Sequence, residues 1–308
     1  IFTVLAGISV LSLLLGTAIT VILSGNIVRP VNALSTAMQR VANGDYDVKL
    51  ETKSNFEIIR RVYSDFNHMV DELNAVETLR NDFVSNVSHE FKTPLSSIEG
   101  YAMLLQDESL SAEARSEYAE RIVVSTRRLS TLVSNILMIT KIENQTMPFT
   151  LSSYRVDEQV RQSILLLENK WSEKNIGFEM DMDSIEFCAV EGLLGNVWSN
   201  LIDNAIKFSP EGEIIYISLK EKDDMLSFKI ANRGEPMSGE TLKRIFEKFY
   251  QGDTSHKREG NGLGLALVKK IVRVHGGSVS AVNTEDGLIE FTVNLPAKRS
   301  CERCCGSN

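Results

Sequence analysis

The chain opens with a long stretch in which every side chain is apolar or neutral. Residues 1–23 carry no charged side chain, whereas charged residues recur throughout the rest of the sequence. A helix needs roughly 20 apolar residues to cross the hydrocarbon core of a bilayer. The alternatives are a buried core helix, which is normally shorter, and a signal peptide, whose apolar region covers only about 7 to 15 residues. The pattern therefore predicts a transmembrane helix over residues 1–25.

The flanks of this segment predict its orientation. Arg29 and Arg40 follow the apolar run, and cytoplasmic flanks of membrane helices are enriched in Lys and Arg. We therefore expect the downstream residues to lie in the cytoplasm, anchored to the cell membrane. Because the apolar run begins at Ile1, which is not methionine, we also expect further sequence upstream, including any sensor region.

The next segment, residues 26–77, repeats apolar residues at helical spacing. A first helix is predicted from Pro30, which is favourable in a first turn, to the stop signal at Asn43 and Gly44. A second series keeps the seven-residue repeat of a coiled coil. The first stripe comprises Val31, Leu34, Met38 and Val41, and the second Ile59, Val62, Phe66, Met69, Leu73, Val76 and Phe83. The predicted order is helix, connector, helix.

Two more amphipathic helices are predicted within residues 78–147. The polar stretch 106–112 between them is short enough for an antiparallel hairpin. One hairpin covers only half of a bundle, so we expect two chains to pair as a homodimer with a four-helix bundle. The apolar seams are Val84, Ser88, Phe91, Leu95, Ile98, Ala102 and Leu105, and then Tyr118, Ile122, Ser125, Leu129, Leu132, Ile136 and Ile139.

A histidine beside the first seam is a candidate reactive group. His89 follows the seam residue Ser88, which predicts an imidazole that faces solvent. A neutral imidazole has a nitrogen lone pair that can attack a phosphoryl group. Glu90 can accept the other ring proton, and Thr93, one helical turn further, can hold a water near a phosphorylated ring. Pro94 lacks an amide hydrogen and predicts a bend at this turn.

From residue 148 to 297 the pattern mixes strands and helices. Helical stretches separate the strand-like runs, which predicts an α/β layer with helices on one face of an antiparallel or mixed sheet. The predicted strands are 176–182, 214–219, 226–231, 278–282 and 289–295.

A helix predicted over residues 193–208 carries candidate metal ligands. Asn200 and Asn204 are four residues apart and Lys207 is three further on, so all three project from one face. Mg²⁺ takes few protein oxygens and completes its shell with phosphates and water, so two amide oxygens beside a triphosphate are favourable. Lys207 would offset phosphate charge, and Phe208 could contact a purine.

A glycine-rich stretch provides a candidate phosphate site. Residues 260–265 read Gly-Asn-Gly-Leu-Gly-Leu, and glycines let backbone amides approach phosphates. The helix predicted to begin near Leu265 adds its positive end. We expect the polar stretch 251–259 to close over a bound nucleotide.

Composition narrows the class of protein. The chain has 43% hydrophobic and 24% charged residues, which excludes collagen-like and wholly disordered chains. Its net charge of −8 disfavours nucleic-acid binding. The tail residues Cys301, Cys304 and Cys305 offer one thiolate fewer than a structural zinc site requires, which predicts a disordered end. His256 and His275 lack metal-ligand spacing, and we assign them surface or loop positions.

Together these segments resemble the membrane-bound sensor histidine kinases of bacterial two-component systems. Residues 28–76 resemble a HAMP relay and residues 83–95 the family's phosphoacceptor box. Residues 200–208, 245–250 and 260–265 resemble its N, F and G2 boxes. The implied multidomain chain is a transmembrane helix (1–25), a HAMP helical module (26–77), a dimeric four-helix-bundle hairpin (78–147), an α/β sandwich ATP-binding domain of Bergerat/GHKL type (148–297) and a flexible tail (298–308).

The resemblance implies an enzyme that uses ATP and Mg²⁺ to autophosphorylate His89. It implies transfer of the phosphoryl group to an aspartate of a response regulator, with Glu90 assisting and Thr93 serving the reverse dephosphorylation. It further implies that Asn200 and Asn204 hold the metal. The implied nucleotide-binding residues are Asn200, Asn204, Lys207, Phe208, Asn232, Gly234, Gly260, Gly262, Leu263, Gly264 and Leu265.

One box departs from the family's common pattern. Where many relatives have Asp-x-Gly-x-Gly, this chain reads Asn232-Arg233-Gly234-Glu235-Pro236. An asparagine oxygen can accept the adenine amino hydrogen, but without the assistance of a charge. We therefore expect ATP binding to be retained and weakened. A non-kinase ATPase, a degenerate nucleotide-binding scaffold and a phosphatase-biased sensor remain alternatives.

Overall fold

The computed structural model describes all residues except 1, 52–53, 55, 145–149, 253–259 and 298–308. Two compact units divide the chain, Ile1–Val87 and Ser88–Asn308, and each is described by itself. The predictions made for His256, for Cys301, Cys304 and Cys305, and for most of the stretch 251–259 lie outside the described residues.

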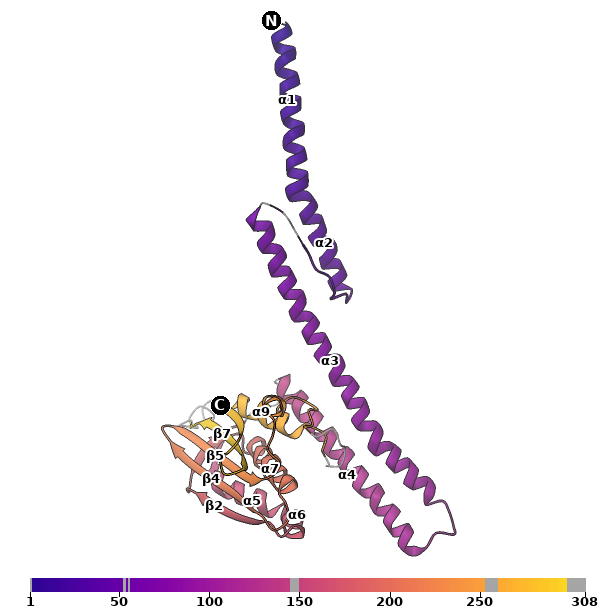
Figure 1. The fold of residues 1–308 in the computed structure, drawn as a ribbon, viewed down its shortest axis with the longest axis vertical. Helices are drawn as coiled ribbons and strands as arrows, with labels where there is room; N and C mark the ends of the chain where they lie inside the picture. Colours follow the sequence, from indigo (N-terminus) through magenta and orange to yellow (C-terminus); the bar gives the residue numbers. More distant parts are fainter. Residues whose placement is uncertain (1, 52–53, 55, 145–149, 253–259, 298–308) are drawn as a thin grey trace, which may run out of the picture. The chain divides into compact units, whose positions relative to one another are not determined.

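The first unit begins with an apolar helix. Helix α1 (Phe2–Leu23) continues through a π-helical turn, η1 (Ser24–Val28), into α2 (Arg29–Ala42) (Figure 1). The large apolar side chains described on α1 are exposed, as a lipid-facing helix requires. In the described part of the chain, residues 5–42 and α4 (Ala112–Glu143) are long and apolar enough to span a membrane. Because α4 contributes Leu132, Ile139 and Ile142 to a protein core, the helix over residues 5–42 is the better candidate for a membrane span.

The predicted stripes of the first unit form a small core of their own. Ala37 of α2 packs with Val48 of the connector and with Phe66 and Val70 of α3 (Glu57–Leu104). The connector is held by Asn67, whose side chain donates to the Leu50 carbonyl and accepts from the Leu50 amide, both at 2.8 Å. The order helix, connector, helix is confirmed, and α3 continues without interruption past Pro94 to Leu104.

The second unit contains the hairpin made by the end of α3 and by α4. Ser111 caps α4 by accepting from the Ala114 amide at 3.2 Å. The rings of Tyr101 and Tyr118 pack across the hairpin with centroids 5.6 Å apart. The seam residue Leu95 is 57% exposed in the single chain, whereas Leu132 and Ile139 of the second seam are buried, so the hairpin leaves part of its apolar seam uncovered.

The remainder of the second unit is an α/β layer. Its five-stranded sheet has the order β2-β4-β5-β7-β6, in which β2 and β4 are parallel and the other neighbours antiparallel. All five predicted strands are confirmed, and a separate antiparallel pair, β1 (Ser152–Arg155) with β3 (Glu186–Ala189), was missed because four residues carry little periodicity. The sheet strands are β2 (Gly177–Met182), β4 (Ile214–Lys222), β5 (Met225–Arg233), β6 (Ser278–Asn283) and β7 (Leu288–Pro296).

Helices cover one face of this sheet. Ile217, Ile230 and Phe291 lie side by side in register and are buried. Trp198 of α7 packs on Phe228 with ring centroids 4.7 Å apart, and its indole nitrogen donates to Gln159 of α5 at 2.9 Å. The expected arrangement of helices on a mixed sheet is thus confirmed. The helices are α5 (Val156–Leu165), α6 (Glu168–Glu173), α7 (Glu191–Phe208), α8 (Gly239–Arg244) and α9 (Gly264–Val274).

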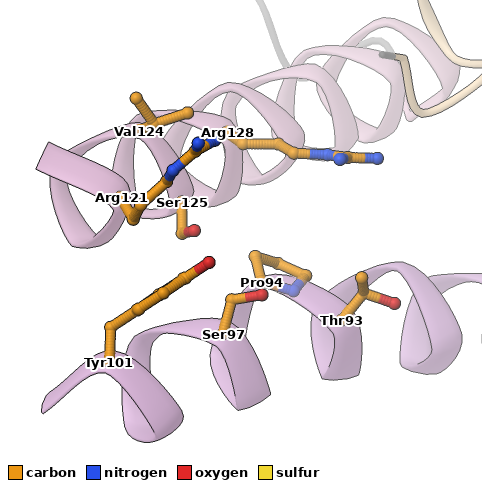
Figure 2. A pocket seen from close by; sticks show the side chains of 8 residues that line it. All are labelled: Thr93, Pro94, Ser97, Tyr101, Arg121, Val124, Ser125 and Arg128. Atoms are coloured by element: carbon orange, nitrogen blue, oxygen red, sulfur yellow. The ribbon is translucent and has the colours of Figure 1, made fainter. Parts of the chain in front are cut away.

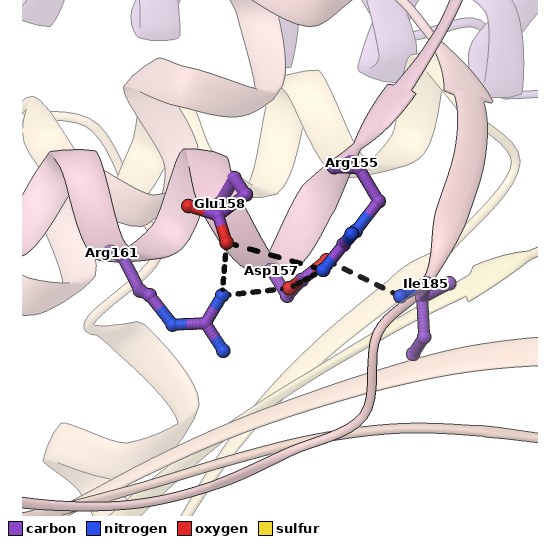
Figure 3. A network of polar contacts seen from close by, with 5 residues as sticks. All are labelled: Arg155, Asp157, Glu158, Arg161 and Ile185. Atoms are coloured by element: carbon purple, nitrogen blue, oxygen red, sulfur yellow. Dashed lines mark hydrogen bonds and ion pairs between the residues drawn. The ribbon is translucent and has the colours of Figure 1, made fainter.

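A buried carboxylate fixes the start of this domain. The Asp157 side chain has no exposed surface and accepts from Arg155 at 2.6 and 2.8 Å, from Arg161 at 2.7 Å and from the Ile185 amide at 3.3 Å (Figure 3). The hydrogen bonds from Arg155, assisted by Arg161 and Ile185, hold the pKa of Asp157 well below its ordinary value. This network joins β1, α5 and the residue that precedes β3.

Candidate functional site

Helix α7 presents a half-buried polar face beside the sheet. Its apolar side packs in the core, whereas Asn200, Asn204 and Lys207 lie on the other side and are half-buried. The side-chain nitrogen Nδ2 of Asn200 donates to the Asn196 carbonyl at 2.7 Å. The Asn200 Oδ1 atom lies on the side of the glycine-rich loop, next to Gly264. The predicted helix is found with its start two residues earlier, at Glu191.

The glycine-rich loop lies directly against this face. A Cβ atom on Gly264 would lie 2.6 Å from Asn200 Oδ1, and one on Gly260 would lie 2.8 Å from Lys207 Nζ. At Gly262 the φ angle is +64°, and a Cβ would lie 2.6 Å from the Phe249 carbonyl carbon. At Gly262, where the contact is with backbone and φ is positive, only glycine fits. At Gly260 and Gly264 the close atoms belong to the side chains of Lys207 and Asn200, so the loop backbone lies directly beside the polar face of α7, an approach that suits a phosphate cradle.

The loop runs into the N-terminus of α9. This helix begins at Gly264, one residue before the expected position, and the loop is tightened by the Leu263 amide, which donates to Asn261 Oδ1 at 3.3 Å. Leu263 is fully buried, and the half-buried Leu265 packs against the core. Both leucines therefore anchor the loop to the core.

Residues 232–236, the box that departs from the family's common pattern, lie where β5 ends, next to the end of α7. Asn232 is 2% exposed, and its Nδ2 atom donates to the Arg233 carbonyl at 3.0 Å. With the amide nitrogen engaged, the Asn232 Oδ1 atom is oriented as an acceptor. A Cβ on Gly234 would lie 3.5 Å from the Phe208 carbonyl, which brings Asn232, Gly234 and Phe208 together.

The donors present fit a magnesium ion. No group of three His, Cys, Asp or Glu side chains suited to a metal occurs among the residues that the structure describes. The Asn200 oxygen beside the Gly264 cradle, with Asn204 one turn further on the same helix, instead offers neutral oxygen ligands. Such a set suits a hard cation that arrives with phosphate oxygens.

His275 lies in the turn that directly follows α9, within the surface or loop position assigned to it, and is half-buried. Both of its ring nitrogens are engaged. Its Nδ1 atom lies 2.8 Å from the Ile271 carbonyl, and its Nε2 atom accepts from the Val190 amide at 3.3 Å. Because Val190 is the residue that precedes α7, His275 connects the end of α9 to the start of α7. Its typical turn position in the sequence gave no signal of this contact.

The phosphoacceptor candidates form a separate group on α3. His89 and Thr93 are exposed, Glu90 is half-exposed, and Thr93 Oγ1 lies 3.4 Å from the His89 carbonyl that it donates to. Pro94, by contrast, is buried. The histidine ring is thus accessible to a reactant, whereas the nucleotide-site residues lie on α7, β5 and the loop before α9.

A polar hollow adjoins Thr93 inside the hairpin. Figure 2 shows Thr93, Pro94, Ser97 and Tyr101 of α3 facing α4, which contributes Arg121, Ser125 and Arg128. The hollow has a volume of about 180 Å³. Its two guanidinium groups give it a positive charge that favours an anionic group near Thr93.

The end of α4 contacts the nucleotide domain. Glu143 Oε1 lies 2.9 Å from Lys248 Nζ and 3.8 Å from Lys270 Nζ. Lys248 belongs to the stretch that resembles the F box, and Lys270 lies on α9. Phe91, two residues after His89, packs against the hydrophobic cluster to which Leu132, Ile139 and Ile142 of α4 also belong.

Family models match three consecutive parts of the chain. Residues 22–75 match the HAMP domain, residues 79–145 the His Kinase A (phospho-acceptor) domain, and residues 189–299 the histidine kinase-, DNA gyrase B- and HSP90-like ATPase. They follow one another in the order expected from the sequence.

Individual proteins are similar over most of the chain. The heme sensor protein HssS of Staphylococcus aureus (strain JH9) is 32% identical over 294 residues, which cover 96% of this chain and 64% of that protein. Full-length ShkA, solved in complex with AMPPNP, has a TM-score of 0.54 at 27% identity, covering 71% of this chain and 46% of ShkA. ThkA, solved in complex with the response regulator protein TrrA, has a TM-score of 0.58 at 23% identity, covering 73% of this chain and 64% of that one.

The chain therefore spans less than two thirds of the length of the curated relatives that it matches. An apolar helix, a HAMP domain, a phosphoacceptor hairpin and a histidine-kinase-type ATPase domain follow one another in it. With this domain series and this similarity, the chain belongs to the sensor histidine kinases of two-component systems.

Proposed function

We propose that this chain is a membrane-anchored protein-histidine kinase that uses ATP to phosphorylate His89 and passes the phosphoryl group to an aspartate of a response regulator. Its parts would be the transmembrane helix 1–25, the relay 26–77, the hairpin 78–147, the ATP-binding domain 148–297 and the tail 298–308. The observation that carries the proposal is an exposed imidazole in the same chain as a glycine cradle packed against Asn200 and Lys207.

The chemistry requires a nucleophile that a phosphate can reach. An unprotonated ring nitrogen of His89 attacks the γ-phosphorus, a P–N bond forms, and the bond to the β–γ bridging oxygen breaks as ADP leaves. The Glu90 carboxylate accepts the proton of the other ring nitrogen and stabilises the charge on the ring. The exposure of His89 supports this role.

The nucleotide would be held by the residues that meet at α7. Asn200 and Asn204 would hold Mg²⁺, Lys207 would offset phosphate charge, and the amides of the stretch 260–265 would approach the phosphates. When bound, the ion would supply neutralisation of the charge on the phosphate oxygens. The adenine amino group is bound by Asn232 Oδ1 as a neutral acceptor, next to Gly234 and Phe208. Full-length ShkA binds the ATP analogue AMPPNP, which supports this assignment.

The second half-reaction moves the phosphoryl group to the partner. The P–N bond on His89 breaks as an aspartate oxygen of the response regulator takes the phosphorus. Thr93 then holds the water that hydrolyses the regulator's acyl phosphate in the reverse activity. The positive hollow beside Thr93, with Arg121 and Arg128, supports an acidic partner at this position. ThkA, which has a similar fold, binds a response regulator.

The hairpin would act as a homodimer. Leu95 is 57% exposed in a single chain although it belongs to an apolar seam. A second hairpin would cover this stripe and complete a four-helix bundle. In such a dimer the ATP-binding domain serves His89 of its own chain or of the partner chain.

A labelling experiment with the membrane-inserted full chain tests the proposal. With γ-labelled ATP and Mg²⁺ we expect acid-labile, alkali-stable label on the protein, lost in His89→Gln. His68→Gln is the matched control, because His68 is exposed on the same helix. Steady ATP hydrolysis without labelled protein would indicate a non-kinase ATPase. Bound nucleotide without either activity would indicate a degenerate scaffold. Retained label in His89→Gln would refute the assignment of the nucleophile.

A further inference from the structure

The C-terminal end of α7 is held by a side chain from outside the nucleotide boxes. Lys174 is the residue that follows α6, and its Nζ atom donates to the carbonyls of Ile206 and Lys207, both at 2.9 Å, and of Ser209 at 3.1 Å. A lysine ammonium has three hydrogens, so all three are used on backbone carbonyls at the end of one helix.

These contacts satisfy carbonyls that a helix leaves unpaired. The last carbonyls of a helix have no partner within it, and a cation is favourable there. The Ala205 carbonyl is taken by the Ser209 amide at 3.0 Å and by the Ser209 hydroxyl at 2.7 Å. The Ile206 and Lys207 carbonyls accept from Lys174 Nζ. Together with the Ser209 carbonyl, the ammonium therefore joins three backbone groups at the end of α7.

The backbone that carries Lys174 is itself fixed. Its carbonyl accepts from the Gly212 amide at 2.9 Å, and the next residue, Asn175, donates from its side chain to Glu211 at 3.3 Å. The ammonium thus projects from a segment tied to the residues that follow α7. The Lys174 ammonium can hold the end of α7 in place because its own backbone is bonded to the residues that follow α7.

The turn that Lys174 holds carries two nucleotide-site residues. Lys207 Nζ lies 4.6 Å from the centroid of the Phe208 ring and 2.8 Å from the position of a Gly260 Cβ. A shift of the last turn would move the ammonium of Lys207 away from the glycine cradle and the Phe208 ring with it. Misplacement of about 1 Å at a binding group is costly.

We propose that Lys174 is a positioning residue for nucleotide binding: it presents Lys207 and Phe208 to the nucleotide by fixing the C-terminal turn of α7. This inference rests on the proposed function, because it takes α7 and the glycine cradle as the ATP site. Lys174 does not touch the nucleotide itself, and its contribution appears in affinity.

The test compares Lys174→Met, which keeps the length of the side chain without its donors, with Lys174→Arg. In autophosphorylation by the membrane-inserted full chain, we expect Lys174→Met to raise the KM for ATP by about tenfold. We expect kcat to stay within about twofold, because His89 and its neighbours are untouched. Lys174→Arg should return the KM to within about threefold of the wild type, since a guanidinium still donates to carbonyls.

A neighbouring lysine provides the matched control. Lys170 lies on α6 and pairs with Asp203 of α7 at 2.5 Å, but the two side chains are 58% and 41% exposed to solvent. Lys170→Met should therefore leave the KM unchanged. Hydrogen exchange of the free protein should be faster at the amides after Lys207 in Lys174→Met and unchanged in Lys170→Met.

The outcomes separate the two hypotheses. If the wild type labels His89 and Lys174→Met has the wild-type KM, the positioning role is wrong and the proposed function stands. If Lys174→Met raised the KM and lowered kcat by the same factor, and Lys174→Arg restored neither, the variants would have lost folded protein in general. That result would also overturn the positioning role. A wild type that binds no nucleotide would refute the proposed function, and this inference with it.

Discussion

The hairpin and the nucleotide domain use apolar residues in opposite ways. In the nucleotide domain the stripes of α7 and α9 are buried on the sheet, and residues such as Trp198 and Leu267 have no exposed surface. In the hairpin the seam residue Leu95 is 57% exposed. The first region is complete within one chain, whereas the second leaves the part of its apolar seam around Leu95 exposed to another surface.

The difference extends to the polar groups. Asn200 and Lys207 are half-buried and placed by the backbone around them, whereas His89 and Thr93 are exposed on a helix surface. A group that binds a nucleotide gains from being held in place before the ligand arrives. A group that must receive a phosphoryl group from one protein surface and give it to another has to remain accessible. The following predictions test this contrast.

The largest effect is expected in the preorganised site. Asn204→Ala removes one of the two proposed amide ligands for Mg²⁺ and should abolish labelling of His89, with a loss of at least about a hundredfold. Asn196→Ala is the control, because Asn196 lies on the same helix and its amide donates to the Gly192 carbonyl at 2.7 Å. Normal labelling of Asn204→Ala with γ-labelled ATP would contradict the magnesium assignment.

The exposed seam provides the next test. Leu95→Glu would bury charges against a second hairpin and should raise the dimer dissociation constant by about a hundredfold, measured by sedimentation of the detergent-solubilised chain. Ser96→Glu, one position off the stripe, should leave the association intact. If the dimer dissociation constant of Leu95→Glu were unchanged, the dimer would be formed by a surface other than the Leu95 seam.

The buried carboxylate of Asp157 tests how much the nucleotide domain depends on its own internal contacts for stability. Asp157→Asn removes the buried carboxylate that Arg155 and Arg161 share and leaves them the exposed Glu158, 4.0 and 2.7 Å away. It should lower the free energy of unfolding at pH 7 by about 2 kcal/mol, since both arginines are partly exposed and screened. Asp181→Asn is the control, because that carboxylate is 77% exposed. Thermal unfolding of the two variants would measure the difference.

The same substitution predicts a pH dependence. Because the pKa of Asp157 is lowered in the folded protein, its stabilisation is complete above the unfolded value of about 4 and is lost as the pH falls through the folded value. The wild type and Asp157→Asn should therefore converge in stability below about pH 4. A difference that stays constant from pH 7 to pH 3 would contradict this network.

The smallest effect on labelling is expected on the accessible helix. Thr93→Ala should leave labelling within about twofold, since the Thr93 hydroxyl is not needed for attack by His89. It should slow dephosphorylation of the response regulator by about tenfold, because the water loses its partner. Thr126→Ala on α4, whose hydroxyl donates to the Ile122 carbonyl at 2.9 Å, is the control. Equal dephosphorylation rates would remove Thr93 from the reverse activity.

The sequence by itself determined the N-terminal apolar helix, the five sheet strands, the hairpin and the boxes that form the candidate site. These features depend on local periodicity and on residue types within a few positions, which sequence patterns retain. The strands β1 and β3 were missed because each has only four residues.

Only the tertiary structure decided which side chains hold the two ends of α7 in place. His275 contacts Val190 across 85 positions of sequence, and Lys174 reaches the carbonyl of Lys207 across 33. Both bond to backbone groups, and a backbone amide or carbonyl is the same for every residue type, so no pattern in the sequence marks it as a partner. Such contacts exist only after the sheet has brought α6, α7 and α9 together.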